Sequence, residues 1–441
     1  MSPELITILM LLGLFVLLAG FPLAFGIGTM GLLFGYLTTG KAYLYMMPQR
    51  VINGTLSEYI LAAVPLFIFM GAMMQTSGVA ERAFTILRKW MAGVRGGLAV
   101  ATVALAIIFA ACTGVVGASE TAIGLLAVPS MLRANYDKGL ASGVVCAGGT
   151  LGILIPPSVM LILYAPMAGV SVTQMYAGAI VPGVMLGLGY IIYVLIRTAI
   201  NPEMGPPLPP EERIPFFSKE SLVSGFKYLI PPVFLIFLVL GSIFFGVASP
   251  TEAGAVGSVG AVGLALMNRT LTWKSFRENC YLTLRITSMI IFIAIASNLY
   301  TGAFLSAGCG QVITDFLLSF GFGPWGVFIT ILVIILILGC FIDWIGILLI
   351  TVPIFSPILM KLGFDPLWVG LVVCVSLQIS FLTPPFAYSI FYLKGIAPEI
   401  PLPAIYRGIV PFVGIQVIVT ILCLLIPDLC LWLPKALEGA K

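Results

Sequence analysis

Long apolar runs, separated by short polar segments, fill almost the whole chain, and one stretch departs from this simple alternation. Between Gly96 and Pro166, a first apolar arm at residues 98–112 is followed by a small polar cluster and then by a second arm at 122–131. At about 1.5 Å per helical residue, each arm is too short to cross a hydrocarbon core of about 30 Å. The pattern therefore predicts a re-entrant helical hairpin over residues 97–132.

The next apolar run, residues 140–166, is long enough to span a membrane but is interrupted in its middle. The interruptions are Gly148-Gly149-Thr150 and Ile155-Pro156-Pro157. Irregular backbone at membrane depth is tolerated only where protein or a water-filled cavity covers it. Short and Gly/Pro-interrupted segments are therefore the best sequence indication of a transporter binding site.

Apolar runs in the rest of the chain predict further membrane-spanning helices and a second hairpin at 325–360. The predicted spans are 4–21, 23–39, 59–76, 140–166, 176–197, 228–247, 251–267, 284–303, 366–392 and 408–433. Only 9% of the residues are charged and 60% are hydrophobic, whereas a soluble domain carries about 25% charged residues. The predicted fold class is an all-α polytopic membrane protein with about ten transmembrane helices plus two re-entrant helical hairpins.

The two halves of the chain resemble each other at a spacing of about 230 residues. Cys112 aligns with Cys340, Pro129 with Pro353, and Pro156 with Pro384. The one long hydrophilic segment, residues 201–227, is rich in proline and suits an extended linker. The predicted divisions are scaffold helices at 1–56, a first repeat at 57–200, the linker at 201–227, central scaffold helices at 228–280, a second repeat at 281–433 and a tail at 434–441.

The basic residues predict how the chain is oriented. If both termini face the periplasm, most of the 21 Lys and Arg residues fall in cytoplasmic loops, as the positive-inside rule requires. The connector before the first hairpin then carries four of them, while its counterpart at residues 311–324 carries none. The first hairpin therefore enters from inside and the second from outside, so that the repeats are inverted.

Three acidic residues, Glu120, Glu252 and Asp343, lie in apolar surroundings, where a charge costs at least a few kcal/mol. Ser249 and Glu252 have the spacing of a capping box, which favours a structural role for Glu252. Glu120 follows Ser119 at the start of the second hairpin arm, where an acid either complements the helix dipole or belongs to a site. Asp343 stands at the tip of the second predicted hairpin without a nearby basic residue, so a bound cation and a helix cap are the alternatives.

Thr113, Ser119, Thr150 and Thr383 place hydroxyl groups beside the predicted helix breaks. Na⁺ suits such oxygen ligands, although these hydroxyls can also bond back to their own helix. The chain has no histidine, which excludes histidine metal sites, general bases and proton relays. We predict no catalytic residues, no cofactor and no metal ion beyond Na⁺. The basic residues, confined to short loops, do not indicate nucleic-acid binding.

At these motifs the sequence resembles the large membrane subunit, of the DctM type, of the tripartite ATP-independent periplasmic (TRAP) transporters. The resemblance covers essentially the whole chain and departs from commoner members mainly at Cys112 and Trp344. The segments that carry it are GASETAIGLLAVPSM (117–131), GGTLGILIPPS (148–158), ASPTEAGAVG (248–257), GCFIDWIGILLITVPI (339–354) and FLTPPFAYS (381–389).

The resemblance implies a Na⁺-driven secondary transporter for an organic acid, mostly a carboxylate, in the bacterial inner membrane. It implies an elevator, in which hairpins and broken helices move against a scaffold. The implied partners are a small four-helix membrane subunit and an extracytoplasmic solute-binding protein, within the lipid bilayer. The residues expected at the substrate site are Gly117, Ser119, Thr150, Pro156, Thr383 and Pro384. Those expected to bind Na⁺ are Thr113, Ser119, Gly149, Gly339, Asp343 and Thr383.

An apolar, helical chain has three alternative functions, which the sequence favours unequally. The first is a stand-alone Na⁺/carboxylate symporter that works without a binding protein. An intramembrane enzyme is disfavoured, because an HExxH motif is impossible without histidine. A purely structural membrane protein would not need two inverted hairpins with polar tips.

Overall fold

The computed structural model describes residues 2–17, 22–114, 116–209, 211, 213, 218–319, 321–385 and 387–439. Within these ranges, the side chains of residues 15–17, 112, 113, 118 and 219–222 lie outside the description. The described α-helices are α1 (Pro3–Leu17), α2 (Leu23–Thr39), α3 (Lys41–Val51), α4 (Ala63–Thr76), α5 (Val79–Trp90), α6 (Gly97–Thr113), α7 (Val116–Arg133), α8 (Lys138–Thr150), α9 (Val159–Ala168), α10 (Val172–Ile200), α11 (Lys219–Phe244), α12 (Pro250–Met267), α13 (Trp273–Ser306), α14 (Cys309–Ser319), α15 (Gly323–Gly339), α16 (Trp344–Lys361), α17 (Pro366–Leu382), α18 (Tyr388–Ile396), α19 (Leu402–Leu425) and α20 (Asp428–Gly439). Four short helical turns complete the order: η1 (Ile52–Leu56), η2 (Tyr59–Ala62), η3 (Leu151–Ile153) and η4 (Pro202–Met204).

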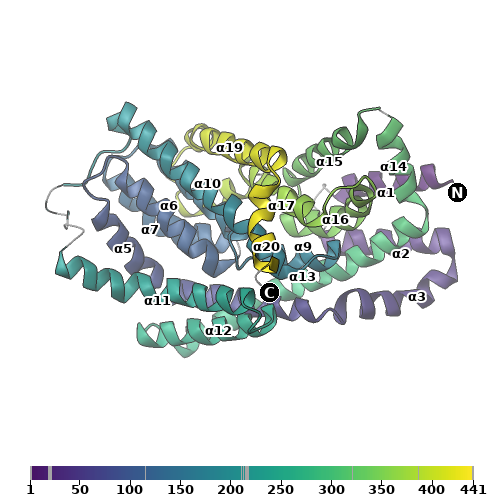
Figure 1. The fold of residues 1–441 in the computed structure, drawn as a ribbon, viewed down its shortest axis with the longest axis horizontal. Coiled ribbons are helices and arrows are strands. Elements are labelled where there is room, and N and C mark those ends of the chain that lie inside the picture. The colour runs from purple at the N-terminus through teal and green to yellow at the C-terminus, as the bar shows by residue number, and fades with distance from the viewer. Residues whose placement is uncertain are drawn as a thin grey trace.

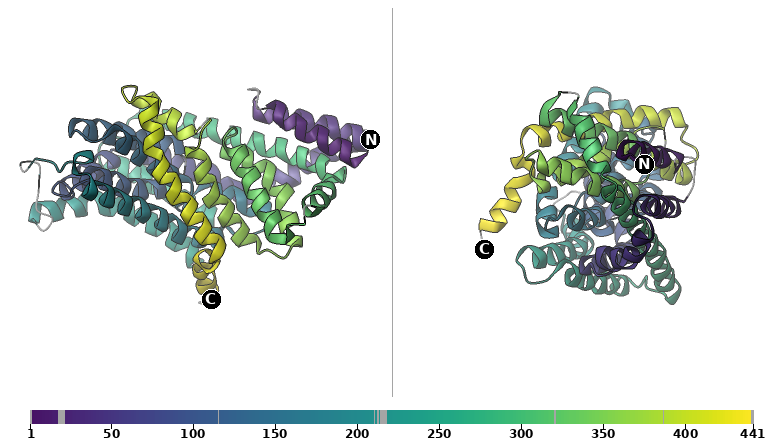
Figure 2. Two further views of the ribbon diagram at one scale, coloured as in Figure 1. Left: turned by 90° about the horizontal axis from the view of Figure 1, so that it is seen from above. Right: turned by 90° about the vertical axis from the view of Figure 1, so that its right-hand side faces the viewer.

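The molecule is elongated, with helices of the first predicted repeat toward one end and helices of the second toward the other (Figure 1). Helices α5, α6 and α7 lie toward one end, and α1, α2, α14 and α15 toward the other, with α9, α17 and α20 between them. A second view, turned about the long axis, keeps this separation (Figure 2). The segments that the sequence marks as interrupted therefore lie in the middle, where the two halves meet.

Two helical hairpins are present where the sequence predicts them. Helix α6 turns into α7, and α15 into α16, and the two arms of each hairpin pack against each other. The first turn contains Gly114 at φ 60°, a left-handed conformation that glycine adopts without a steric penalty. That each hairpin enters and leaves the membrane on the same side stays a prediction.

The two interrupted runs are broken helices. In the first half, α8 ends at Thr150 and α9 begins at Val159, with η3 and an irregular segment between them. In the second half, α17 ends at Leu382 and α18 begins at Tyr388. Asp137 and Asp365 cap α8 and α17, because their carboxylates accept a hydrogen bond from the third helical backbone N–H. Both breaks contain a cis Pro-Pro bond, Pro156-Pro157 and Pro384-Pro385.

Among the described residues, fewer helices have the length and composition of a membrane span than the sequence predicts. Within the described residues, six helices are long and apolar enough to cross a membrane, and a seventh results if α14 and α15, bent by 115°, count as one. The six are Tyr59–Thr76, Val172–Ile200, Val223–Phe244, Trp273–Ser306, Trp344–Lys361 and Leu402–Leu425. A polytopic, all-helical membrane protein is confirmed, whereas the count of ten spans stays a prediction.

Several predicted boundaries differ from the structure. The predicted span 408–433 is two helices, because α19 ends at Leu425 and α20 begins at Asp428. Helix α20 runs on to Gly439, so most of the predicted tail 434–441 is helical. Helix α11 begins at Lys219, inside the predicted linker 201–227. At residues 219–227 a helix continues through polar residues, whereas the break between α19 and α20 falls at Ile426-Pro427, within an apolar run.

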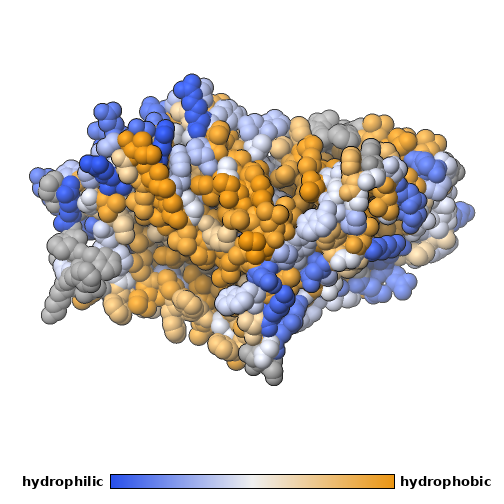
Figure 3. All heavy atoms as spheres, turned by 45° about the horizontal axis from the view of Figure 1, so that its top comes forward, coloured by the Kyte–Doolittle hydropathy of each residue, from blue (hydrophilic) through white to orange (hydrophobic). Residues whose placement is uncertain are grey.

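The outer surface is apolar over much of the molecule. Phe234 and Phe237 of α11 are 63% and 71% exposed, and Val259 of α12 is 73% exposed. Hydrophobic residues cover most of the middle of the face in Figure 3, and hydrophilic residues gather near its margins. Soluble monomers rarely expose contiguous apolar patches of this extent, so lipid is the natural covering.

The structural role that the sequence predicts for Glu252 is confirmed, and the structure adds a buried methionine cluster. Ser249 and Glu252 form a reciprocal capping box at the start of α12, with a hydrogen bond of 2.7 Å from the Ser249 N–H to Glu252 Oε2. The methionines at 70, 73 and 74 are buried in the core between α4 and its neighbours. Glu252 therefore belongs to the fold rather than to a binding site.

Candidate functional site

The first part of the site lies where the tip of the first hairpin meets the first broken helix. Ser119, near the start of α7, is buried, and its hydroxyl contacts the carbonyl oxygen of Val116 at 2.9 Å and that of Gly149 at 3.2 Å. A methyl group on Gly149 would lie 2.7 Å from the Cβ of Glu120. Glycine is thus needed at 149 for α7 and α8 to approach, and the hydroxyl and carbonyl oxygens converge there.

Glu120 is fully buried beside this contact and bonds to the second half of the chain. Its Oε2 atom accepts a hydrogen bond of 2.6 Å from the hydroxyl of Ser389 on α18, which also lies 3.1 Å from the carbonyl oxygen of Cys146. The other carboxyl oxygen, Oε1, is buried without a hydrogen-bond partner among the described residues. Glu120 therefore is a structural link between hairpin and broken helix, and its Oε1 is available to a bound group.

The second part of the site lies at the tip of the second hairpin. A methyl group on Gly339, the last residue of α15, would overlap the side chain of Ser380 on α17. The hydroxyl of Ser380 lies 3.4 Å from the carbonyl oxygen of Leu336. Thr383 ends α17, and its hydroxyl donates back to the carbonyl of Ile379 at 2.7 Å. Hairpin tip and helix break thus pack together in both halves.

Asp343 occupies the N-cap position of α16 but makes no regular side-chain capping bond. Its half-buried carboxylate interacts with the backbone N–H groups of Trp344 and Ile345. The carboxylate thus lies at the N-terminus of α16, against the first backbone N–H groups of that helix.

Tyr392 of α18 lies at the first part of the site. Its ring packs on Gly117 of the first hairpin, where any side chain would overlap it. Because α18 packs against α7, α8 and α17, one short helix lies against the first hairpin and both broken helices.

The predicted substrate residues Thr150, Pro156 and Pro384 have three different surroundings. The hydroxyl of Thr150 donates to the Ala147 carbonyl at 2.9 Å and lies 3.4 Å from Nε2 of Gln416 on α19, which also bonds Tyr190. Thr150 therefore faces α19 and α10. Pro156 is buried in the break, and Pro384 is exposed. The side chain of Thr113 lies outside the described residues.

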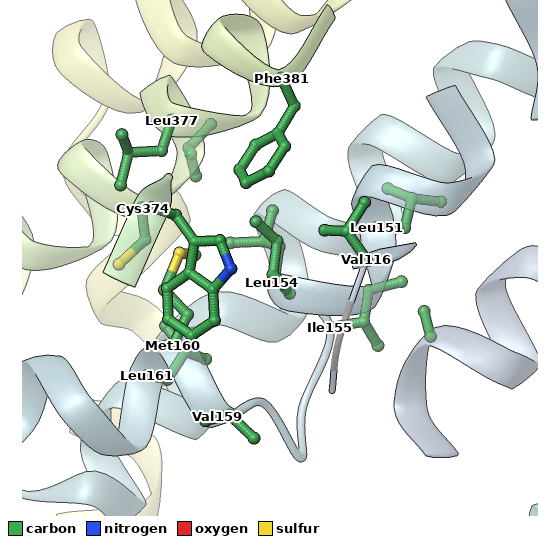
Figure 4. Packing of buried hydrophobic residues seen from close by; sticks show 14 of the residues in the cluster. Val116, Leu151, Leu154, Ile155, Val159, Met160, Leu161, Cys374, Leu377 and Phe381 are labelled. Carbon is green, nitrogen blue, oxygen red and sulfur yellow. The ribbon is translucent and has the colours of Figure 1, made fainter. Parts of the chain in front are cut away.

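Apolar packing holds the two broken helices together beneath these polar groups. In Figure 4, Cys374, Leu377 and Phe381 of α17 face Leu154 and Met160 around the first break. All five are buried. The core therefore joins the two interrupted segments across the two halves, and the polar groups lie at the edge of that core.

The arrangement suits the binding of a cation better than chemical catalysis. The converging groups are carboxylate, hydroxyl and carbonyl oxygens, which are the ligands that alkali cations take at broken helices. A carboxylate at membrane depth needs a partner, and in the described residues neither Glu120 nor Asp343 forms an ion pair within 4 Å.

The sequence alone did not indicate several residues of this site. Ser389, Tyr392 and Ser380 lie within apolar runs, and their hydroxyls become significant only through contacts from other helices. The alignment of Tyr164 with Tyr392 in the two repeats was the available signal. Gln416 lies on α19, far from any motif.

Comparisons with known proteins agree with this arrangement. The family model described as the DctM component of the tripartite ATP-independent periplasmic transporter matches residues 9–429. A C4-dicarboxylate TRAP transporter large permease protein of Vibrio cholerae is 30% identical and covers 99% of both chains, and one of Pseudomonas aeruginosa is 32% identical over 86% of this chain and 87% of its own. The solved YdaH transporter of Alcanivorax borkumensis shares the fold at a TM-score of 0.63 and 14% identity, with 97% and 98% of the two chains covered. The chain therefore belongs to the DctM family of TRAP transporter large permeases and is a membrane transporter rather than an enzyme.

Proposed function

We propose that this permease moves a small organic acid across the inner membrane, coupled to Na⁺, after an extracytoplasmic binding protein delivers the acid. The observation that carries the proposal is that each hairpin tip packs on a helix break, with the buried Ser119 and Glu120 at the first contact and Asp343 at the second tip. Oxygen groups arranged in this way bind a cation, because no Lys or Arg side chain among the described residues forms an ion pair with them.

The family relation supports the choice of an organic acid. The two relatives described above are named as C4-dicarboxylate transporters. In this chain, the hairpin arms and broken helices carry no Lys or Arg near their tips. Helix N-termini at the tips supply backbone N–H groups and a partial positive charge for the acid, and bound Na⁺ supplies the remainder. Acid and Na⁺ then bind cooperatively, with a coupling of about 1–3 kcal/mol.

The proposed motion is that of an elevator, in which the hairpins and broken helices move against a scaffold that includes α1, α2, α11 and α12. A small four-helix membrane subunit completes the scaffold, as expected for the family. Both termini face the periplasm in this arrangement.

The test is uptake in proteoliposomes that contain the chain, its small subunit and candidate binding proteins loaded with labelled acids. We expect uptake only with an inward Na⁺ gradient and a loaded binding protein. Uptake that is equal without the binding protein would instead identify a stand-alone symporter. Uptake that is equal with Na⁺ and with a non-binding cation would contradict the proposed coupling.

A further inference from the structure

A separate cavity of about 260 Å³ lies away from both hairpin tips, between α3, η1 and α13 on one side and α9 and α16 on the other. Its polar lining comes from Arg50, Thr55, Glu58, Asn298 and Thr301, all on the α3, η1 and α13 side or on the segment that follows η1. The opposite wall is apolar and includes Met167 and Pro353. The α3 helix packs along α13 in this region (Figure 1).

Arg50 is the unusual member of this lining. Its Nε atom is buried without an acceptor among the described residues, and its one hydrogen bond, from Nη2 to the hydroxyl of Ser306, is long at 3.5 Å. The absence of a side chain at Gly302 makes room for the guanidinium, since a methyl group there would overlap it. The structure thus holds a cationic group in place without satisfying its donors.

The neighbouring groups do not neutralise Arg50. Glu58 lines the same cavity but is exposed, and no ion pair joins it to Arg50 in the described part of the chain. The hydroxyl of Thr301 is buried in the cavity wall and also lacks a hydrogen-bond partner there. Unpaired buried polar groups are costly, so the buried Nε of Arg50 and the Thr301 hydroxyl, both without a described partner beside one cavity, point to a ligand.

We propose that this cavity is a second binding site, which takes the carboxylate of a small organic acid on Arg50. A guanidinium offers parallel N–H donors that match the two oxygens of a carboxylate, and Thr301 supplies a further hydroxyl. The proposal rests on the proposed function, because the acid bound here is the transported one on its way to or from the hairpin tips.

The position of the cavity gives the site a role in transport. The α9 and α16 helices begin at the helix break and the hairpin tip, and they form the apolar wall. The polar wall belongs to α3 and α13, and α13 packs along the scaffold helix α2. Movement of α9 and α16 against α13 therefore opens the cavity and releases the acid. In the predicted orientation, Arg50 lies on the periplasmic side, where a binding protein hands over its ligand.

The test measures occupancy in the cavity itself. In the full chain with its small subunit, Asn298→Cys serves as a reporter in the cavity wall, and its labelling rate by a maleimide is followed by peptide mass spectrometry. Succinate, pyruvate and gluconate are the probes, and succinamide is the uncharged control. We expect at least one acid, and not succinamide, to slow the labelling.

When Arg50→Gln is added to the Asn298→Cys protein, the protection by the acid should weaken about 10- to 100-fold. This is the change expected from the loss of one hydrogen bond to a charged group. Arg50→Lys keeps the positive charge but loses the parallel N–H donors. Protection in this protein should lie between that with Arg50 and that with Arg50→Gln. Arg285→Gln, the same charge change at an exposed position of the same α13 helix, should leave protection unchanged. Glu58→Gln should leave protection unchanged or strengthen it, because it removes a negative charge beside the acid.

Two results would overturn the second site. One is a lack of protection by all three acids, and the other is equal protection in the Arg50→Gln protein. If Arg50→Gln does not fold, Gly302→Ala, which displaces the guanidinium and keeps the charge, must weaken protection instead. Uptake is measured in parallel. Protein that takes up acid without protection at residue 298 disproves only this inference, whereas protein without any uptake disproves the proposed function.

Discussion

Single residues decide which buried oxygens are satisfied at the hairpin tips. The Ser389 hydroxyl has one proton, yet it lies within hydrogen-bond distance of both Glu120 Oε2 and the Cys146 carbonyl. The hydroxyl donates either to Glu120 Oε2 or to the Cys146 carbonyl, so the two acceptors share its one proton. The contact therefore works as a small network in which each partner depends on the other.

The first prediction concerns this network. Glu120→Gln keeps the shape and an acceptor for Ser389 but removes the charge, so we expect thermal stability close to that of the unchanged protein and weaker Na⁺-dependent uptake. Glu120→Ala and Ser389→Ala each leave a buried partner unsatisfied and should lower the free energy of unfolding by about 1–3 kcal/mol. Combining the two alanines should cost less than the sum of the single losses. Strict additivity, or a Glu120→Gln protein as unstable as Glu120→Ala, would contradict the network.

The second prediction concerns Asp343. Its carboxylate lies at the N-terminus of α16 and forms no ion pair within 4 Å among the described residues. We expect Asp343→Asn to reduce Na⁺-driven uptake strongly while the yield of folded protein stays unchanged, as measured by gel filtration and initial uptake rates across Na⁺ concentrations. An unchanged Na⁺ dependence would limit Asp343 to capping α16.

At the scale of elements, close packing at the helix breaks holds each hairpin in place. The α7 helix approaches α8 at Gly149, and α15 approaches α17 at Gly339 and Ser380. In each half a hairpin tip thus rests on the point where its neighbour stops being helical. Backbone carbonyls freed there are covered by protein, which is what permits irregular backbone at membrane depth.

The third prediction tests the contact at α8. Gly149→Ala places a methyl group 2.7 Å from the Cβ of Glu120, so we expect it to separate α7 from α8 and to reduce uptake and thermal stability. Gly263→Ala on α12 is the matched control, since nothing lies within 4 Å of the added methyl group. That change should be neutral or stabilising by about 1 kcal/mol, because alanine favours the helix. Equal effects of the two substitutions would mean that the hairpin contact is unimportant.

At the scale of the whole molecule, the halves are joined through interrupted helices in the centre rather than through one continuous core helix. The α18 helix, from the second half, packs on the first hairpin, and α19 packs along α8. The second half therefore completes the site at the first hairpin.

The fourth prediction concerns orientation. In a Cys280→Ser background, which removes an exposed native thiol, an impermeant maleimide should label Lys435→Cys in intact cells. It should label Glu203→Cys only after the membrane is permeabilised. Both positions are exposed. Labelling of the Glu203→Cys protein from outside would reverse the predicted topology.

Much of the fold could be predicted from the sequence because hydrophobicity, interruption by Gly and Pro, and internal repetition are local properties. These patterns place both hairpins, both broken helices and the capping box of Glu252 correctly. They do less well at segment ends, such as residues 219–227 and 426–427, where a helix continues through polar residues or stops among apolar ones.

What only the tertiary structure decided is which distant groups meet. The sequence by itself determined that polar atoms stand at breaks in apolar helices, since that is written in the order of residues. Whether Glu120 caps its own helix or bonds to Ser389, 269 residues away, depends on the packing of α18 against α7. The same holds for Thr150, which faces Gln416, and for Arg50, whose significance arises only when α3 lies against α13. Contacts between segments far apart in the chain depend on how helices pack, and no local pattern encodes their pairing.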